Sequence, residues 1–476
     1  MRAHEAGVLH AEAMFGAAAR PAWLRPPDDV NALLPKLWAS SVRRGADGAL
    51  SVGGVSVSDL AAQHGTPAYV VDELDFRARA RAFRDAFDGA FRDLCGGADV
   101  YYAAKAFVTV EVARWVAAEG LRLDTTSGGE LLVGLRAGTD PAHLTLHGNN
   151  KTDAELARAL DARVGRVVVD AAEEVDRLAD AARARGTRAR VMIRANVGVE
   201  AHTHEFLATA HEDQKFGIAL ADGEAAAVAA TVLARPELEL VGLHCHIGSQ
   251  IFDTPAFDLA IRRLVGLHAA IGRDHGVRLP EMDLGGGFGV AYVSHHSPLG
   301  PHEIAPRLAH SLATECRAEG VDVPRVSVEP GRAIAGPSTF TLYEVGTVKE
   351  VRLDGGGGRR YVSVDGGMSD NVRTAMYDAE YSATLASRAS DAAPVLARVV
   401  GRHCESGDIV VRDEFLPGDV TRGDLLAVPV TGAYCRSLSS QYNHTPRPPV
   451  VAVRDGRVRT LLRRETEDDL LALDAG

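Results

Sequence analysis

The fold is decided by residues 166–198, RVVVDAAEEVDRLADAARARGTRARVMIRANVG. RVVVD (166–170) and RARVMIRANVG (188–198) are apolar runs of strand length, and their β-branched residues are typical of buried strands. The segment between them has helical length and is rich in Ala, Arg and acidic residues. A helix between two successive strands predicts a right-handed crossover and a parallel sheet.

The same alternation extends in both directions along the chain. Strands are predicted at residues 98–106, 121–127, 144–148, 166–170, 188–198, 239–249, 281–290 and 325–332. Segments of helical length separate most of them. Eight such units in about 250 residues are typical of a closed (β/α)8 barrel of the TIM type.

The pattern changes after residue 336, where short β-prone runs follow one another with Gly, Asp or Pro between them and without helices. This spacing predicts an antiparallel sheet or sandwich. The α/β chain is therefore divided into an N-terminal arm with strands that pack with the β domain (1–70), a β/α barrel (71–335) and a C-terminal antiparallel β domain (336–476).

Composition excludes several classes of protein. The 476 residues carry 52 Lys and Arg against 64 Asp and Glu, a net charge of −12, which argues against a nucleic-acid partner because phosphates need a basic surface. The sequence contains no run of 18 or more apolar residues, so no membrane span is predicted. The N-terminal residues do not resemble a signal peptide. Five scattered cysteines without a CxxC pair favour neither disulfides nor a metal site, so a cytoplasmic protein is expected.

Candidate site residues occur where predicted strands end, because active sites of such barrels lie at the C-terminal ends of the strands. They are Lys105, Asp124, Ser127, His147, Asn149, His244, His246, Ser249, Gly285, Gly286, Gly287, Gly289, Glu329, Gly331 and Arg332. Lys105 has two interpretations: an aliphatic stem that reaches the surface, or a desolvated amine that forms a Schiff base.

Three further motifs keep alternatives open. DLGGGFG (283–289) offers backbone N–H groups for a phosphate or forms a tight turn, but it lacks the third glycine of a dinucleotide fingerprint. The motif HCH (244–246) places two histidines on one face of a strand. A zinc site is not favoured because no third ligand has a clear spacing, and His244 is best interpreted as a hydrogen-bonded structural histidine. In EPGR, Glu329 and Arg332 pair with each other, or the Glu329 carboxylate serves a ring nitrogen while the Gly331 N–H contacts an anion.

HCESGD (403–408) places a thiol beside a carboxylate in the second domain. His403 is adjacent in sequence to Cys404, and such adjacency rarely gives the geometry of a nucleophile and its base. A cysteine protease is therefore not favoured.

The chain resembles the diaminopimelate decarboxylases, which are fold-type III pyridoxal-phosphate-dependent enzymes. The motifs YYAAKAF, SGGE, HGNNK, HEDQKFG, GLHCHIGSQ, DLGGGFG, EPGR, DGGMSDN, CESGD and GAY occur in the order seen in that family. The resemblance runs from about Val52 to Leu471. MSDN-x-R-x-x-x-Y and CESGD-x-x-x-R-D are specific to this branch, and the long N-terminal arm is similar to the actinobacterial form. The resemblance implies the fold shared by alanine racemase and ornithine decarboxylase.

The resemblance also implies site roles. Lys105, His246, Glu329 and Cys404 would be catalytic: Lys105 holds the pyridoxal 5'-phosphate covalently, His246 stacks on its ring, Glu329 bonds the pyridine nitrogen and Cys404 donates a proton. Cofactor contacts would include Asp124, Ser249, Gly286, Gly287, Gly331, Arg332 and Tyr434. Substrate contacts would be Arg332, Arg373, Tyr377, Glu405 and Tyr434. Because Cys404 would reach the partner's site, the active unit would be a homodimer.

The implied activity is that of a carboxy-lyase that converts meso-2,6-diaminopimelate into L-lysine and CO2, the last step of lysine biosynthesis. The far end of this substrate carries a carboxylate and an ammonium, which two arginines and a glutamate complement. The first alternative is a related decarboxylase for ornithine, arginine or a carboxylated polyamine, which would not need Arg373. The second is a non-catalytic protein that has kept the fold, against which Lys105, Glu329 and Cys404 argue together.

Overall fold

The structure is a computed structural model that describes residues 20–199, 215–220, 222–352 and 358–476. The first 19 residues of the predicted arm lie outside these ranges, as does most of the HEDQKFG motif. The chain divides into two compact units. The barrel unit comprises Arg77–Val290 and Ser297–Ile334, and the β unit comprises the described residues up to Phe76, Ala291–His296 and those of Ala335–Gly476.

Eight parallel strands form the barrel, which confirms the predicted (β/α)8 architecture. They are β5 (Ala98–Ala103), β6 (Arg122–Thr125), β7 (Leu144–Leu146), β8 (Arg166–Val169), β9 (Ala189–Asn196), β11 (Leu238–His244), β12 (Glu281–Asp283) and β13 (Arg325–Val328). Each strand pairs in parallel with the next, β13 pairs with β5, and the barrel is thereby closed. The two-residue strand β10 (Ile218–Ala219) lies beside β9.

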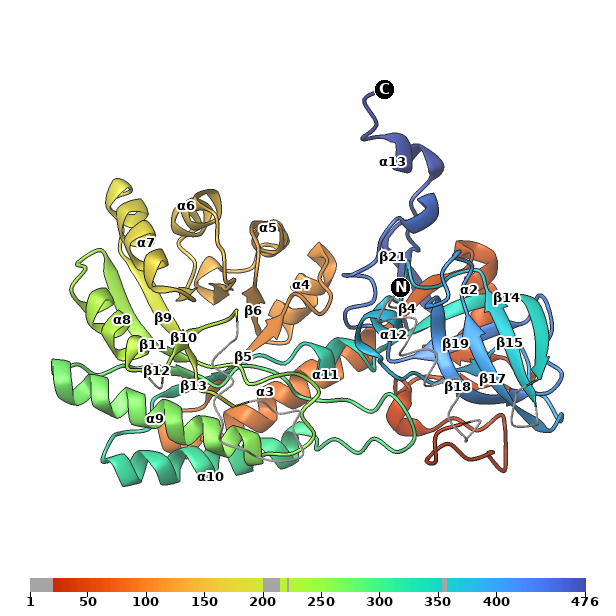
Figure 1. Cartoon of the computed structure of the whole chain (residues 1–476), viewed down its shortest axis with the longest axis horizontal. Coiled ribbons are helices and arrows are strands. Elements are labelled where there is room, and N and C mark those ends of the chain that lie inside the picture. The colour runs from red at the N-terminus through yellow and green to blue at the C-terminus, as the bar shows by residue number, and fades with distance from the viewer. Residues whose placement is uncertain (1–19, 200–214, 221, 353–357) are drawn as a thin grey trace, which may run out of the picture. The chain divides into compact units, whose positions relative to one another are not determined.

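Helices surround these strands, as Figure 1 shows. They are α3 (Glu73–Cys95), α4 (Val110–Ala118), α5 (Gly128–Ala137), α6 (Asp153–Ala162), α7 (Ala172–Ala184), α8 (Glu224–Leu233), α9 (Pro255–His275), α10 (Pro301–Glu319) and the short α11 (Arg332–Ala335), with a 3-10 turn at Pro141–His143. Local chemistry fixes their ends. Thr152 and Glu155 form a capping box at the start of α6, and Gly276 ends α9 with a left-handed backbone.

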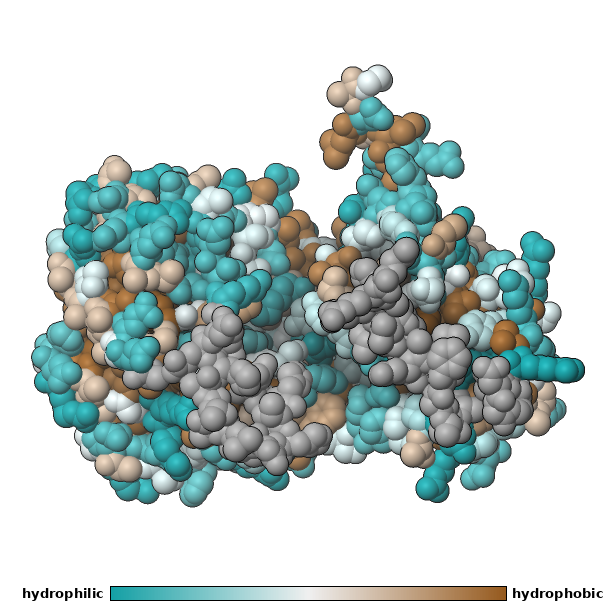
Figure 2. Space-filling view, viewed as in Figure 1, coloured by the Kyte–Doolittle hydropathy of each residue, from teal (hydrophilic) through white to brown (hydrophobic). Residues whose placement is uncertain are grey.

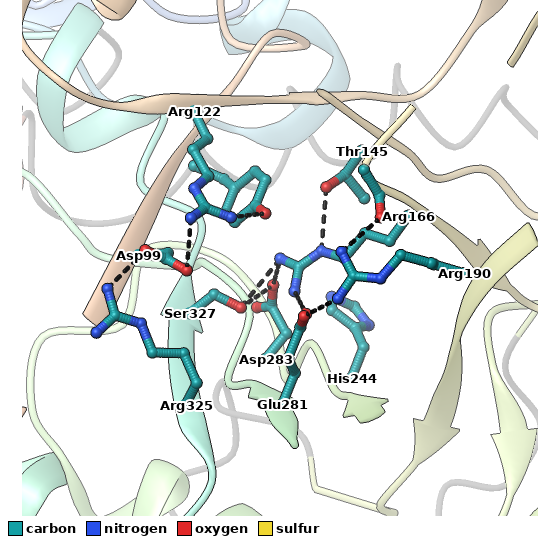
Figure 3. A network of polar contacts seen from close by, with 12 residues as sticks. Asp99, Arg122, Thr145, Arg166, Arg190, His244, Glu281, Asp283, Arg325 and Ser327 are labelled. Carbon is teal, nitrogen blue, oxygen red and sulfur yellow. Dashed lines mark hydrogen bonds and ion pairs between the residues drawn. The ribbon is translucent and has the colours of Figure 1, made fainter. Parts of the chain in front are cut away.

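A buried polar network lies among the barrel strands (Figure 3). Arg166, 3% exposed, donates from Nη2 to Asp283 Oδ2 at 2.7 Å and to Ser327 Oγ at 3.0 Å. Its Nη1 lies 3.1 Å from Glu281 Oε2, and its guanidinium carbon lies 4.2 Å from the centre of the Tyr101 ring. These contacts satisfy a buried cation that would otherwise be costly to desolvate.

The β unit contains a sheet in the order β18-β17-β15-β14-β4-β20-β21, with β19 also beside β14 and β16. Its strands are β4 (Ala68–Asp72), β14 (Thr339–Arg352), β15 (Gly358–Val364), β16 (Thr384–Leu385), β17 (Pro394–Val400), β18 (Ile409–Pro417), β19 (Leu425–Pro429), β20 (Val450–Arg454) and β21 (Arg457–Leu462). The long β14 pairs with β4 and β19 through its first half and with β15 through its second half.

This sheet is mixed, so the prediction of a purely antiparallel domain needs correction. β15 pairs with β17 and β4 pairs with β20 in parallel, whereas the other pairings are antiparallel. Parallel neighbours need a long connection. The 365–393 segment supplies one, and most of the chain separates β4 from β20, so neither pairing has a local signature in the sequence.

Smaller elements complete the β unit. They are a sheet of β1 (Arg43–Arg44), β2 (Leu50–Val52) and β3 (Val55–Ser56), helices α2 (Val57–His64), α12 (Arg373–Tyr377) and α13 (Glu467–Leu471), and 3-10 turns at Pro35–Leu37 and Tyr442–His444. The C-terminal segment exposes Leu471 (58%) and Leu473 (96%), and Figure 2 shows hydrophobic residues along it. No helix in the described part of the chain is long and apolar enough to cross a membrane.

Candidate active site

The barrel unit holds a cluster of ionisable side chains at the C-terminal ends of its strands. Asp124 lies in β6, His244 ends β11, and Lys105, His147, His246 and Glu329 follow β5, β7, β11 and β13 within two residues. Lys105 is half-buried and lies close enough to Asp124 and His246 for its positive charge to act on both. Burial and the charge of Lys105 together lower the pKa of His246, whereas in Asp124 burial outweighs the effect of Lys105. The barrel therefore assembles residues that are distant in sequence, as the positions of the strand ends predicted.

Glu329 lies between two histidines. Its Oε1 is 3.0 Å from Nε2 of His147 and 3.3 Å from Nε2 of His244, and all three residues are at most 5% exposed. Burial by itself would raise the pKa of Glu329, but the histidines outweigh it and hold that pKa well below its ordinary value. The arrangement keeps this buried carboxylate ionised.

The same histidines respond to their surroundings in opposite ways. Burial lowers the pKa of His244, and the carboxylate of Glu329 does not offset it. For His147, burial is outweighed by Asp124, 3.5 Å away, and Glu329, so its pKa is raised. Burial also raises the pKa of Asp124 to about 7. Sequence reasoning treated His244 as a structural histidine and placed His147 among the strand-end candidates without a specific role. Their shared contact with Glu329 is not visible in any local motif.

His246 presents a neutral ring. Burial, helped by the positive charges of Lys105 and Arg194, lowers its pKa well below the ordinary value. The N–H of Gly286 donates to its Nδ1 at 3.2 Å. A neutral imidazole held by its edge leaves a flat face for packing, as expected for a residue that stacks on a cofactor ring.

The four glycines of the glycine turn (residues 285–289) have no room for side chains. A Cβ on Gly285 would lie 2.3 Å from the Cys245 carbonyl oxygen, and one on Gly286 would lie 2.3 Å from that of Glu329. The strand predicted at 281–290 ends at Asp283. The closely packed glycine turn takes the place of its second half. Asp283 Oδ1 accepts the Gly285 N–H at 2.8 Å.

Ser249, Gly331 and Arg332 lie in the same unit. Arg332 donates from Nη2 to Ser249 Oγ at 2.6 Å. A Cβ on Gly331 would lie 2.9 Å from that of Ala103. An anion such as a phosphate would fit the Ser249 hydroxyl, the Arg332 guanidinium and the backbone N–H of Gly331, which no side chain covers. With Lys105, His246 and Glu329, the donor set fits pyridoxal phosphate.

In the β unit, Arg373 lies among three tyrosines, of which the sequence singled out only Tyr434. Its Nη1 donates to Tyr292 Oη at 2.7 Å and to Tyr381 Oη at 2.6 Å. Its guanidinium carbon lies 5.9 Å from the Tyr434 ring centre. Arg373 is only 6% exposed, and no carboxylate of the described residues forms an ion pair with it.

The other predicted residues of the β unit are more exposed. Tyr377 is 62% exposed, although Arg373 of the same short helix is buried. Cys404 is exposed. Glu405 is also exposed, and its Oε1 accepts a hydrogen bond from Tyr442 Oη at 2.5 Å.

Two groups of described residues have a geometry that could hold a metal. They are His147, His244 and Glu329 in the barrel, and His295, His296 and Glu380 in the β unit. In the second group the Tyr292 N–H donates to His296 Nδ1 at 3.2 Å, which leaves the ring proton on Nε2, the atom that faces Glu380. That tautomer suits a histidine–carboxylate contact better than a metal ligand.

Comparison with known proteins agrees with this geometry. The family model of the pyridoxal binding domain of pyridoxal-dependent decarboxylases matches residues 74–336. Diaminopimelate decarboxylase of Mycobacterium leprae is 50% identical over the full length of both chains, and that of Mycobacterium tuberculosis H37Rv is 52% identical over 93% of this chain and 98% of its own. The crystal structure of diaminopimelate decarboxylase from M. jannaschii with L-lysine has a TM-score of 0.85 at 28% identity and covers 92% of this chain and 98% of its own.

Fold, site and family match thus define a pyridoxal-dependent decarboxylase, a carboxy-lyase with the cofactor predicted from the sequence. Within that class, the chain belongs to the diaminopimelate decarboxylase family. The predicted family is confirmed. A lysine/ornithine decarboxylase from Vibrio vulnificus shares the fold, with a TM-score of 0.69 at 21% identity.

Proposed function

We propose that this protein removes the carboxyl group at the D centre of meso-2,6-diaminopimelate and yields L-lysine and CO2, the last step of lysine biosynthesis. The observation that carries the proposal is the identity of about half of all residues, over the whole chain, with proteins named diaminopimelate decarboxylase. The site geometry supports the same conclusion in two places, the barrel cluster and the buried Arg373 with its tyrosine contacts.

The barrel residues would hold the cofactor. The Lys105 amine would bind it covalently, the glycine turn with Ser249, Gly331 and Arg332 would contact its phosphate, and His246 would pack on its ring. Bound pyridoxal phosphate supplies an electron sink for the electron pair that remains on the α-carbon when CO2 leaves. Glu329, kept ionised by His147 and His244, would accept a hydrogen bond from the protonated ring nitrogen.

The β unit would recognise the far end of the substrate. Arg373 is a buried cation whose described partners are neutral hydroxyls, so a substrate carboxylate would complete its charge pairing. Glu405 would take the distal ammonium, and Tyr377 and Tyr434 would be further substrate contacts of this unit. Ornithine and lysine lack the distal carboxylate and would gain nothing from Arg373.

Cys404 would donate the proton that the α-carbon needs after CO2 has left. In the isolated chain it is exposed, which suits a thiol that reaches into the site of a second subunit. Exposed Met376 (55%) and Tyr377 (62%) support a subunit interface at this part of the β unit. The proposal therefore includes a homodimer with shared active sites. Five cysteines, none in a disulfide, suit a reducing cytoplasm.

A substrate panel tests the proposal against its alternative. The purified protein loaded with pyridoxal phosphate is given meso-diaminopimelate, ornithine, arginine, lysine and a carboxylated polyamine, and CO2 release is measured. The proposal expects kcat/KM to be highest for diaminopimelate. A preference for ornithine, arginine or the polyamine would establish the related decarboxylase instead.

Subunit mixing tests the shared site. Lys105→Ala and Cys404→Ala proteins are each expected to be nearly inactive, and mixing them should restore activity because one site of each mixed dimer keeps both residues. No recovery, with subunit exchange verified by mass spectrometry, would contradict the shared site.

A further inference from the structure

A buried carboxylate closes the loop that carries Cys404 and Glu405. Asp408, 3% exposed, accepts the His403 N–H at Oδ2 over 2.7 Å and the Met368 N–H at Oδ1 over 2.6 Å. Its own carbonyl oxygen accepts the Gly401 N–H at 2.9 Å. Asp408 thus joins the two ends of the 401–408 loop and ties that loop to residues 366–371.

Two glycines allow this close approach. A Cβ on Gly367 would lie 2.4 Å from Asp408 Oδ1, and one on Gly401 would lie 2.3 Å from Oδ2. Gly367 also has a φ of 154°. A further backbone bond, from the Arg402 N–H to the Gly366 oxygen at 3.0 Å, runs between the same loops. Any side chain at either glycine would therefore collide with the Asp408 carboxylate.

The His403 side chain brings in a third segment. Its Nδ1 donates to Asn443 Oδ1 at 3.0 Å, and in that tautomer Nε2 accepts the Ser369 hydroxyl at 2.8 Å. The Ser440 N–H donates to the Ser369 carbonyl oxygen at 2.9 Å. Three loops of the β unit, 366–371, 401–408 and 440–444, are consequently held together by polar contacts, of which those of Asp408 with His403 and of His403 with Ser369 are buried.

These loops carry, or lead into, residues that the proposed function assigns to proton donation and substrate binding. Cys404 and Glu405 lie inside the loop that Asp408 closes, and residues 366–371 lead directly into α12, which begins at Arg373. Buried hydrogen bonds of this kind fix a loop because leaving the N–H groups unpaired is costly.

We propose that Asp408 and His403 are positioning residues that fix the Cys404 thiol relative to the segment that carries Arg373. This inference rests on the proposed function, in which Cys404 donates the proton. Asp408 makes no contact with substrate in this account; it acts through the loop.

A double-mutant cycle separates positioning from general damage. Asp408→Asn keeps the size of the side chain but offers one acceptor oxygen for two N–H groups. In the wild-type background it should lower kcat on the order of 100-fold, the loss typical of a reacting group displaced by about 1 Å. In a Cys404→Ala background it should change kcat by no more than about twofold, since a residue that acts through Cys404 has nothing left to position. Equal losses in both backgrounds would overturn the inference.

Asp424→Asn is the matched control. Asp424 is also a buried carboxylate of the β unit; it accepts the Thr421 N–H at 3.0 Å and pairs with Arg388 at 2.9 Å, in a different loop. Its substitution should leave kcat unchanged. If Asp408→Asn does not fold, Ser369→Ala replaces it, because this change removes only the hydroxyl bonded to His403. Ser369→Ala should lower kcat by a smaller factor, and again only when Cys404 is present.

Amide hydrogen exchange, measured without substrate, makes the test independent of the proposed activity. The Met368 and His403 amides should exchange faster in Asp408→Asn than in wild type and remain unchanged in Asp424→Asn. Unchanged exchange of these two amides would show that Asp408 does not hold the loop and would overturn the inference. If the wild-type protein released no CO2 from diaminopimelate, the proposed function would fall and the exchange result would still decide whether Asp408 holds the loop.

Discussion

Arg166 and Asp283 form an ion pair inside the barrel, with Nη2 2.7 Å from Oδ2 and both side chains at most 3% exposed. The other oxygen of Asp283 accepts the N–H of Gly285, the first residue of the glycine turn. The polar core of the barrel is therefore linked directly to the backbone that is expected to hold the phosphate.

Arg166→Met should lower the free energy of unfolding by about 3–5 kcal/mol, because it leaves a buried carboxylate without its cation, and should also weaken retention of pyridoxal phosphate. Denaturant unfolding and dialysis measure the two effects. Arg190→Met is the control: Arg190 contacts the same Glu281 but is 43% exposed, so a loss of at most about 1 kcal/mol is expected. Equal losses for both variants would contradict the account.

Lys105→Ala should abolish turnover, since no other amine would bind the cofactor covalently. Borohydride reduction of the wild-type protein loaded with pyridoxal phosphate, followed by peptide mass spectrometry, should place the label on Lys105. Lys151 is a useful internal comparison: it is buried in the same barrel, but its Nζ lies 2.7 Å from Glu174, and it should stay unlabelled. A label on any other lysine would refute the assignment.

Cys404→Ala should fold and retain the cofactor absorbance yet turn over roughly 10²–10⁴-fold more slowly, the usual contribution of a general acid. Cys95→Ala removes a half-exposed thiol of the barrel unit and should have no effect on kcat. Turnover of Cys404→Ala at the wild-type rate would remove this thiol from the mechanism.

Arg373→Ala should reduce kcat/KM for diaminopimelate by roughly 30-fold to several thousandfold, since a charge-assisted contact in a closed site is worth about 2–5 kcal/mol. Cofactor absorbance should not change. Arg373→Lys keeps the charge but loses the planar guanidinium, whose Nη1 donates to both Tyr292 and Tyr381, so an intermediate loss is expected. An unchanged kcat/KM in Arg373→Ala would refute the distal-carboxylate assignment.

Asp370 gives the protein a pH-dependent stability. It is 1% exposed, accepts hydrogen bonds from Tyr343 Oη and the Gly367 N–H, and burial raises its pKa to about 7. The folded protein therefore keeps a proton that the unfolded chain releases near pH 4, so this group makes the free energy of unfolding fall as pH rises from about 4 to 7, by up to about 1.4 kcal/mol per pH unit. Urea unfolding at several pH values should show a flatter dependence in Asp370→Asn. Parallel curves for the two proteins would contradict it.

The barrel was predictable because its strands are buried on both faces and helices separate them, so each strand has a local signature. RVVV of β8, fully buried, is an example. The pairing of β4 with β20 was not predictable, because nothing in AYVVD identifies a partner almost four hundred residues away.

The site shows the same division. Lys105, Glu329 and the glycine turn stand at strand ends, where chemistry in a barrel is expected. The contacts of His147 and His244 with one carboxylate oxygen, and those of Tyr292 and Tyr381 with Arg373, depend on which strands and loops meet in space. Local sequence carries no signal for such contacts.

The most direct test of the central claim follows one carbon atom. The purified protein, loaded with pyridoxal phosphate, is given meso-diaminopimelate that carries ¹³C in the carboxyl group of its D centre, and CO2 and amino-acid products are measured together. The account predicts labelled CO2 and L-lysine in equal amounts. Unlabelled CO2, D-lysine as the product, or no release of CO2 would contradict it.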